Sequence, residues 1–153
     1  MDENKRQQII SGLQKAYFKE LETAMNYLPN SVNLDGIKAE EVKETLSAEV
    51  DDELNHAKQL AERIKDLGGS VPGSFEFKAE QKSLQPPEDT TNLKSVVQGV
   101  VDAEEDAIQH YRYLIDLCDG IDYVTQDLCV ALLQDEEKHR RIFRGFLLEL
   151  NKS

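Results

Sequence analysis

Two short stretches decide the fold: Asp52-Glu-Leu-Asn-His56 and Asp135-Glu-Glu-Lys-His139. Each contains Glu-x-x-His, and residues three apart on a helix lie on the same face. Both pairs interrupt stripes of apolar residues at helical spacing. A carboxylate on such a face loses its hydration unless a cation or hydrogen bonds compensate it. The two stretches therefore predict two helices that present oxygen and nitrogen ligands to a buried point.

Two further glutamates interrupt the apolar stripes of the other amphipathic segments. Glu104 falls on the stripe of the third segment and Glu20 on that of the first. Each is followed seven residues later by a tyrosine, Tyr27 or Tyr111. We consider two roles for these tyrosines: they hydrogen-bond the glutamate of the opposite half, or they fill the core with their hydroxyls reaching water.

The candidate ligands repeat between the two halves of the chain, because Glu53 follows Glu20 by 33 positions and Glu136 follows Glu104 by 32. Such a pseudo-symmetric set suits two divalent or trivalent metals. In this hypothesis two glutamates bridge the metals, two others each bind one metal, and each metal takes one imidazole nitrogen. The bridging glutamates would be Glu53 and Glu136. Glu20 and Glu104 would each bind one metal, and His56 and His139 would supply the imidazole nitrogens.

A single Glu-x-x-His pair on a charged helix is as compatible with a solvated face as with a site. Two pairs on apolar stripes, matched by two more glutamates, favour a shared ligand. Helix rotation is uncertain by one or two residues at this stage, so neighbouring acids remain alternative ligands that we expect at the surface. These are Glu22, Glu49, Glu105 and Glu137, and His110 is also expected at the surface.

The apolar periodicity predicts an all-α protein with a single domain over residues 1–153 and four helices. Pro29 is expected to end or kink the first helix and Asp35 to cap the second. One of Thr90, Thr91 or Asn92 should cap the third. Two hairpins joined by one long crossover are typical of an antiparallel four-helix bundle of the ferritin-like type. The expected helices span about 4–28, 36–67, 92–119 and 122–150, with the crossover over about 68–91.

The composition excludes several classes of function. The formal net charge is −12, and the acids are spread throughout, which disfavours nucleic-acid binding through a basic face. Neither a secretory signal nor a membrane-spanning run is evident, so a cytoplasmic protein is expected. Cys118 and Cys129 form no CxxC pair, which excludes a thiolate zinc or rubredoxin-type site within one chain. We expect reduced, semi-buried thiols, with no disulfide required.

These motifs resemble those of the ferritin-like di-iron carboxylate proteins. The greatest similarity is to bacterioferritins and bacterial ferritin-like proteins, and it lies in three runs: DELNHA at 52–57, Leu67-Gly-Gly-Ser-Val-Pro72 and Leu133-Gln-Asp-Glu-Glu-Lys-His139. The resemblance implies two iron ions, with manganese or zinc as alternatives, on the six residues matched to the family's motif. It also implies that Fe(II) is oxidised by oxygen or hydrogen peroxide in a homo-oligomer, either a dimer or a cage. The six residues matched to the family's motif are Glu20, Glu53, His56, Glu104, Glu136 and His139.

The sequence departs from relatives within this superfamily in four respects. Leu54 stands where bacterioferritins have their haem-binding methionine, which argues against haem. The sequence continues for only fourteen residues after His139, which argues against the fifth helix of 24-subunit cages. The first helix lacks the histidines of the smaller starvation-type cages, and the CxxC pairs of rubrerythrins are missing.

Three functional hypotheses follow. The first is a ferroxidase that serves iron storage or detoxification. The second is a peroxide-reducing enzyme with rubrerythrin-like or manganese-catalase-like chemistry. The third is a structural bundle in which the metal acts only as a staple.

Overall fold

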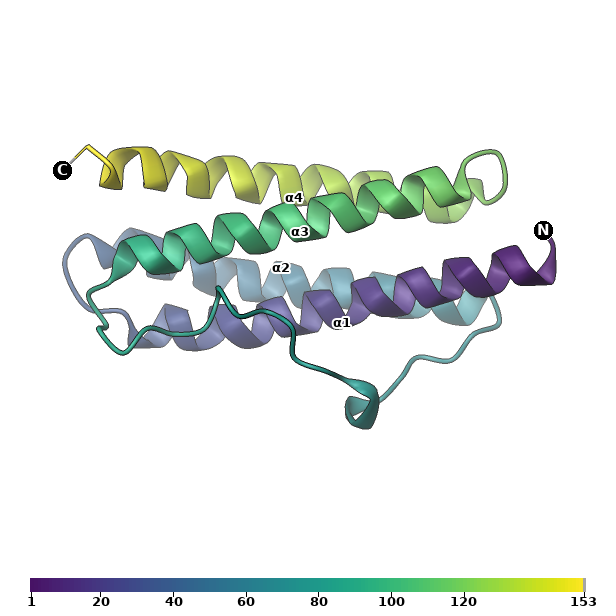
Figure 1. The fold of residues 1–153 in the computed structure, drawn as a ribbon, viewed down its shortest axis with the longest axis horizontal. Coiled ribbons are helices and arrows are strands. Elements are labelled where there is room, and N and C mark those ends of the chain that lie inside the picture. The colour runs from purple at the N-terminus through teal and green to yellow at the C-terminus, as the bar shows by residue number, and fades with distance from the viewer. Residues whose placement is uncertain (153) are drawn as a thin grey trace.

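The chain folds into two helical hairpins that lie side by side in a computed structural model, which describes residues 1–152 (Figure 1). The described residues contain no strand, and besides the four long helices they form one short 3-10 turn. This confirms the expected all-α architecture. The elements are α1 (Glu3–Asn33), α2 (Ala39–Asp66), η1 (Ser74–Glu76), α3 (Leu93–Cys118) and α4 (Tyr123–Leu150).

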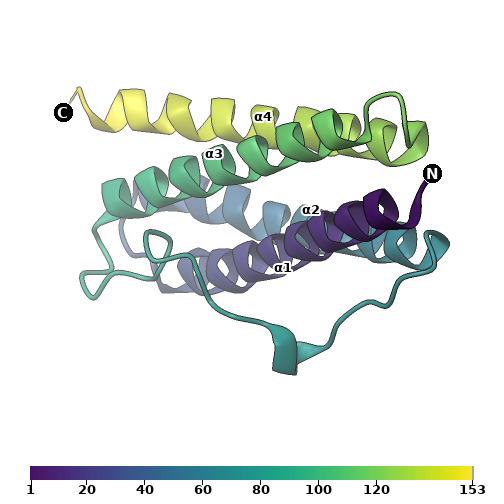
Figure 2. The same cartoon turned by 45° about the vertical axis from the view of Figure 1, so that its right-hand side comes forward.

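A long crossover joins α2 to α3 and runs back along the length of the bundle, with η1 standing away from the helices (Figure 2). The carboxylate of Glu22 on α1 holds the crossover, since it accepts hydrogen bonds from the backbone N–H groups of Glu80 and Gln81 at 2.9–3.0 Å. Glu22 is therefore buried, and its expected surface position is wrong. The burial is tolerated because backbone donors satisfy the charge.

The expected end of the first helix near Leu28 is also wrong, because α1 continues through Pro29 to Asn33. Proline removes one backbone donor but does not forbid a helix whose last turn is held by other contacts. The side-chain amide of Asn30 donates to the carbonyl of Asn26 at 2.9 Å and to that of Leu84 in the crossover at 3.0 Å. A tertiary contact thus overrides the local signal.

Asp35 does not cap α2, which begins about three residues later than expected, at Ala39. Instead, the Asp35 carboxylate accepts a hydrogen bond of 2.6 Å from the hydroxyl of Thr90, and the Asp35 backbone N–H donates to the Thr90 carbonyl at 2.9 Å. Asp35 therefore ties the first hairpin to the end of the crossover. Of the three residues considered for the start of α3, Asn92 is the cap, accepting from the backbone N–H of Ser95.

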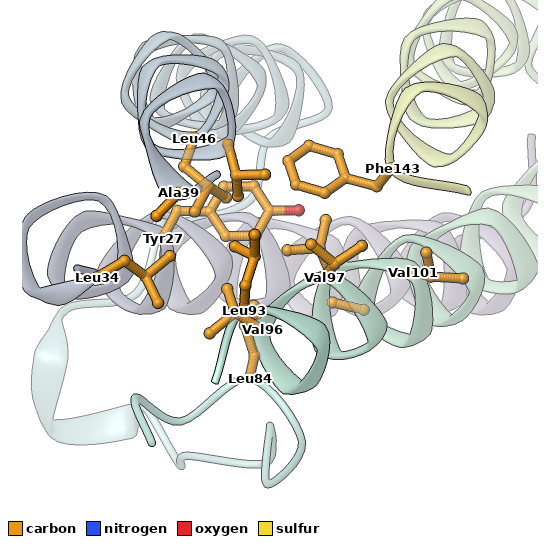
Figure 3. Packing of buried hydrophobic residues seen from close by; sticks show 13 residues of the cluster. Tyr27, Leu34, Ala39, Leu46, Leu84, Leu93, Val96, Val97, Val101 and Phe143 are labelled. Carbon is orange, nitrogen blue, oxygen red and sulfur yellow. The ribbon is translucent and has the colours of Figure 1, made fainter. Parts of the chain in front are cut away.

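The interior of the bundle consists of two apolar clusters separated by a polar layer. One cluster contains Tyr27, Leu46, Val97 and Phe143 (Figure 3). The other contains Ile9, Leu13, Leu60, Ile64, Leu114 and Leu132. Along each helix, the candidate ligands lie between residues of one cluster and residues of the other. Apolar packing on both sides therefore fixes the level at which the four helices present their polar side chains.

Cys118 and Cys129 are fully buried free thiols rather than semi-buried ones. Burial raises the pKa of Cys118 to about 11 and that of Cys129 to about 12. Both cysteines pack in the second apolar cluster, where a thiol behaves as a small hydrophobic group.

Over residues 1–152, no helix combines the length and the apolar character needed to cross a bilayer.

Candidate metal centre

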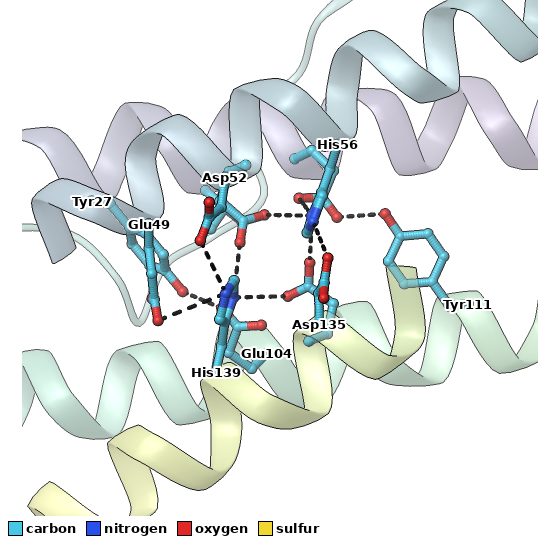
Figure 4. Close-up of polar contacts among 12 residues, drawn as sticks. Tyr27, Glu49, Asp52, His56, Glu104, Tyr111, Asp135 and His139 are labelled. Carbon is cyan, nitrogen blue, oxygen red and sulfur yellow. Dashed lines mark hydrogen bonds and ion pairs between the residues drawn. The ribbon is translucent and has the colours of Figure 1, made fainter. Parts of the chain in front are cut away.

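All six candidate ligands lie together in the middle of the bundle and are buried. Glu20 comes from α1, Glu104 from α3, and the two Glu-x-x-His pairs from α2 and α4. Figure 4 shows Glu104, His56 and His139 at this centre. The apolar stripes of the four helices turn these side chains inward, because the same faces carry the core residues on either side. The exposed fractions are 2% for Glu20, 1% for Glu53, 2% for His56, 1% for Glu104, 1% for Glu136 and 6% for His139.

The six residues form two overlapping groups, each able to hold one metal ion. Within a group, each residue offers one ligand atom, and these atoms all lie within 4.8 Å of one another. Glu53 and Glu136 belong to both groups. The first group adds Glu20 and His56, and the second adds Glu104 and His139.

His56 is held through both ring nitrogens. Its Nδ1 faces the centre, 3.0 Å from Oε1 of Glu136 and 3.5 Å from Oε2 of Glu20. Its Nε2 lies 3.0 Å from Oδ2 of Asp135 on α4. A carboxylate behind a ligating histidine fixes the ring and the tautomer that leaves the other nitrogen free for metal.

His139 has a similar orientation but looser contacts. Its Nδ1 lies 3.3 Å from Oε1 of Glu53. Its Nε2 lies 3.4 Å from Oδ2 of Asp52 and 3.9 Å from Oε1 of Glu49, both on α2. The rings of His56 and His139 are nearly parallel, at 16°, with centroids 6.3 Å apart. The two halves therefore meet around one centre with their imidazoles aligned.

The two tyrosines each bind the glutamate of the opposite half. The hydroxyl of Tyr111 donates to Oε1 of Glu20 at 2.5 Å, and the hydroxyl of Tyr27 donates to Oε1 of Glu104. The sequence left two roles open for these tyrosines, and the structure shows the first, a hydrogen bond to the glutamate of the opposite half. Both tyrosines are also buried in the apolar clusters, with 0% and 1% of their surfaces exposed.

Several buried polar atoms of the centre have no hydrogen-bond partner. They are Oε2 of Glu20, Oε1 of Glu53, Oε2 of Glu104 and Nδ1 of His139. Buried polar groups are nearly always satisfied in folded proteins, and leaving several together unpaired is costly. Carboxylate oxygens and imidazole nitrogens are the donors that iron, manganese and zinc accept. The residues present therefore fit bound cations.

The acid–base properties of the centre follow from burial and from crowding of like charges. Burial raises the pKa of Glu104 to about 7. Burial and the nearby charges of Glu104 and Glu53 raise the pKa of Glu136 well above its ordinary value. Burial opposes the charge on His139, but the carboxylates of Glu53, Glu49 and Glu104 outweigh it and raise its pKa to about 9. The metal-free centre thus retains protons that bound cations would replace.

Some residues near the centre were not predicted, or were placed wrongly. Asp52 and Asp135 back the histidines, and the repeated Asp-Glu-x-x-His pattern was the available signal for them. Glu49 is only 3% exposed, so its expected surface position is wrong; on α2 it precedes Glu53 by one helical turn, on the same buried face.

The remaining two acids and the third histidine lie away from the centre. Glu137 is exposed, and Glu105 is half-buried and accepts a hydrogen bond of 2.6 Å from Arg140. His110 is half-buried rather than at the surface, with its Nε2 2.8 Å from the carbonyl oxygen of Gly12.

Comparisons with known proteins agree with this architecture. The chain is 27% identical over 144 residues to a DNA protection during starvation protein of Pyrococcus furiosus, covering 92% of this chain and 77% of the relative. It is 27% identical over 138 residues to a bacterioferritin of Desulfovibrio desulfuricans, covering 90% and 73%. A solved structure from Bacillus anthracis, described as ferritin like, diiron-carboxylate proteins, superposes with a TM-score of 0.83 at 22% identity, covering 96% and 99%.

The family model of the ferritin-like domain matches residues 10–153, a span that contains all four helices apart from the first turns of α1. This match covers far more than half of the sequence, and the solved structure shares the fold over nearly its whole length. The chain therefore belongs to the ferritin-like domain family.

Proposed function

We propose that the chain is a ferroxidase that binds two Fe(II) ions inside the bundle and oxidises them with oxygen or hydrogen peroxide, for iron storage or detoxification. The observation that carries this proposal is that two four-residue groups share Glu53 and Glu136. Two shared carboxylates would hold two cations as one unit rather than as independent sites. Glu20 and His56 would complete one position, and Glu104 and His139 the other.

The charges of the residues support this assignment. Four ionised glutamates with two neutral histidines carry four negative charges, which equal the charge of two divalent cations. A buried charge is tolerated when it is paired, so two divalent cations would neutralise the ionised ligand set in place of the protons that the metal-free centre retains. The carboxylate-rich ligand set also suits hard cations better than it suits copper(I), which prefers thiolates and thioethers.

Iron is the substrate in this proposal. Each Fe(II) loses one electron, and the oxidant takes two electrons from the pair; with hydrogen peroxide, the O–O bond breaks and two hydroxide ions form. The chain supplies position and exclusion of water: the tyrosines orient Glu20 and Glu104, and the aspartates orient the two histidines. The names of a bacterioferritin relative and of a diiron-carboxylate neighbour support iron over manganese and zinc.

Anaerobic titration of the metal-free protein with Fe(II) tests the proposal. We expect two irons per chain, followed by growth of ferric absorbance on addition of oxygen or of peroxide. Comparing the two oxidants at equal iron loading identifies the one that is used. Parallel titrations with Mn(II) and Zn(II) separate metal binding from iron oxidation.

The matched variants are Glu53→Gln, which alters a shared ligand, and Glu137→Gln, which alters an exposed glutamate on α4. The first should lose the oxidation signal and the second should retain it. Binding of two Fe(II) without accelerated oxidation would contradict a ferroxidase and favour a metal that only staples the bundle.

We also propose that the chain associates with further copies of itself through the outer face of α1. Met25, Leu28 and Val32 lie at helical spacing and are 60%, 55% and 68% exposed. An exposed apolar stripe of this kind is typical of an interaction surface. Light scattering of the purified protein should show an oligomer, and the double variant Met25→Lys/Leu28→Lys should shift it toward smaller species. A wild-type monomer would contradict this.

A further inference from the structure

The two most exposed large hydrophobic side chains of the described residues lie in different parts of the fold. Phe75 on η1 is fully exposed, and Ile37, just before α2, is 96% exposed. η1 stands away from the helices alongside the bundle, whereas the loop that carries Ile37 lies at the end where α4 finishes (Figure 1, Figure 2). A single exposed apolar side chain needs no explanation by itself, but each of these two has a defined setting.

The turn that carries Phe75 is held in place. Two backbone hydrogen bonds of 3.1–3.2 Å close the turn over residues 73–77. The ring of Phe77 packs against that of Phe18 on α1, with the centroids 5.7 Å apart. One aromatic ring of the turn thus fastens it to the bundle, while the ring of Phe75 stays in solvent. A side chain presented in this way loses little freedom on binding, which suits Phe75 to be the anchor of an interface.

Ile37 borders an apolar groove at the end of the bundle where α2 and α3 begin and α4 ends. The groove has a volume of about 240 Å³. Its apolar lining comes from these three helices and from the loop before α2: Ile37, Val42, Leu93, Phe146 and Leu150. A cavity of about 150 Å³ with a lining of this kind accommodates a benzene molecule. The groove therefore has room for one phenyl ring.

The charges at the edge of the groove complement those of the turn. Three exposed charged residues line this edge: Lys38, Glu41 and Glu149. On the turn, Glu76 directly follows Phe75 and Lys78 lies three residues after it, and both are exposed. With the ring in the groove, the turn can set a carboxylate against Lys38 and an ammonium group against one of the two glutamates. Opposite charges around an apolar contact orient the two partners and favour the correct pairing.

We propose that Phe75 of one chain inserts into this groove on a second copy of the chain, with Glu76 against Lys38. The ring and the groove are different surfaces of the same molecule, so the contact joins copies head to tail. Such a contact builds a ring or a chain of subunits, whereas a patch that meets itself builds only a dimer. The inference goes beyond the metal centre and depends neither on it nor on the contact through α1.

Mixing two defective variants tests the head-to-tail contact. Both are made in the Met25→Lys/Leu28→Lys background, so that the α1 contact does not contribute. Phe75→Glu removes the ring and keeps the groove, whereas Ile37→Glu places a charge at the groove and keeps the ring. Each variant alone should associate about tenfold to a hundredfold more weakly than the background protein, the scale expected for one buried phenyl ring.

An equimolar mixture of the two variants should form a dimer and nothing larger, because only one ring and one intact groove can meet. Analytical ultracentrifugation over a range of concentrations measures both effects. A mixture that stays monomeric would overturn the proposal. A wild-type oligomer that the α1 lysines reduce to a monomer at every concentration would also overturn it, while leaving the α1 contact standing.

Reversing the charges tests the orientation of the turn in the groove. Glu76→Lys and Lys38→Glu should each weaken association, and the two substitutions in one chain should restore it, because the ion pair forms again with its polarity exchanged. Glu44→Lys, at an exposed position of α2 outside the groove, changes the net charge equally and should have no effect. Weakening by both single substitutions without recovery in the double variant would overturn the proposed arrangement.

Cross-linking identifies the occupied surface directly. With benzoylphenylalanine in place of Phe75, irradiation should join two chains, and the attached peptide should contain residues 37–42 or 146–150. The same group in place of Tyr113, which is 53% exposed on α3, should give no link to those peptides. Links between chains from position 75 to any other surface would overturn the proposal.

Discussion

Tyr111 on α3 donates a hydrogen bond of 2.5 Å to Oε1 of Glu20 on α1, although the two residues are 91 positions apart in the sequence. Tyr27 on α1 makes the reciprocal bond to Oε1 of Glu104 on α3. In both glutamates the other oxygen, Oε2, has no hydrogen-bond partner. The tyrosines thus hold one oxygen of each carboxylate and leave the other available toward the centre.

Replacing Tyr111 or Tyr27 by phenylalanine should leave a buried carboxylate oxygen unpaired. We expect each variant to lose about 1–3 kcal/mol in the free energy of unfolding of the metal-free protein. Metal affinity should fall by about tenfold, since the glutamate is no longer oriented. Urea denaturation and Zn(II) titration measure the two effects. Tyr113→Phe, at a 53% exposed position, is the control. Wild-type behaviour of Tyr111→Phe would mean that the ring only fills the core.

Changing a shared ligand should affect metal binding differently from changing an unshared one. Glu20 belongs to one of the two groups, whereas Glu53 belongs to both. Glu20→Gln should therefore weaken one of two bound metals and leave the other tight, while Glu53→Gln should weaken both. Calorimetric titration with Zn(II) resolves the two steps. Equal effects of the two substitutions would contradict the sharing of Glu53.

The stability of the metal-free protein should fall as the pH rises. Burial raises the pKa of Glu104 from 4.5 to about 7. The pKa of His139 is raised from 6.5 to about 9 because nearby carboxylates outweigh the opposing effect of burial. Both groups bind protons more tightly in the folded chain than in the unfolded chain. The free energy of unfolding should therefore decrease between about pH 4.5 and about pH 7 through Glu104, and between about pH 6.5 and about pH 9 through His139.

Urea denaturation of the metal-free protein across this range tests the trend. Glu104→Gln removes one titrating group and should flatten the lower part of the profile. Saturating Zn(II) should stabilise the protein more at high pH than at low pH, because metal binding displaces the retained protons. A metal-free protein that becomes more stable between about pH 6.5 and about pH 9 would contradict the assignment of the raised pKa values.

Two helical glycines should respond in opposite ways to alanine. A Cβ at Gly99 on α3 would lie 2.4 Å from the backbone oxygen of Ser83 in the crossover, whereas a Cβ at Gly145 on α4 meets nothing within 4 Å. Gly99→Ala should cost about 1–3 kcal/mol through overpacking. Gly145→Ala should be neutral or stabilise by up to about 1 kcal/mol through helix propensity. Thermal or urea unfolding of both variants provides the comparison, and a stable Gly99→Ala would mean that the crossover shifts freely.

The pattern of the sequence was sufficient for the architecture because each helix carries an apolar stripe at a period that only a helix turns into one face. Four glutamates interrupt the same stripes, which marked them as candidate ligands: Glu20, Glu53, Glu104 and Glu136. Local signals were less reliable at the helix ends. Pro29 was expected to end or kink α1, and Asp35 to cap α2, but contacts with Leu84 and Thr90 in the crossover decide both ends. Such contacts join residues about 55 positions apart and leave no local trace.

The sequence by itself determined the four helices, the hairpin connectivity and the set of glutamates and histidines that face inward, because helical periodicity records which side chains must avoid water. Only the tertiary structure decided which tyrosine pairs with which glutamate, that Glu22 and Glu49 are buried, and that His56 is held more tightly than His139. Those features depend on the rotation and height of one helix against another. Side-chain packing across the bundle sets both, and a single helix does not encode them.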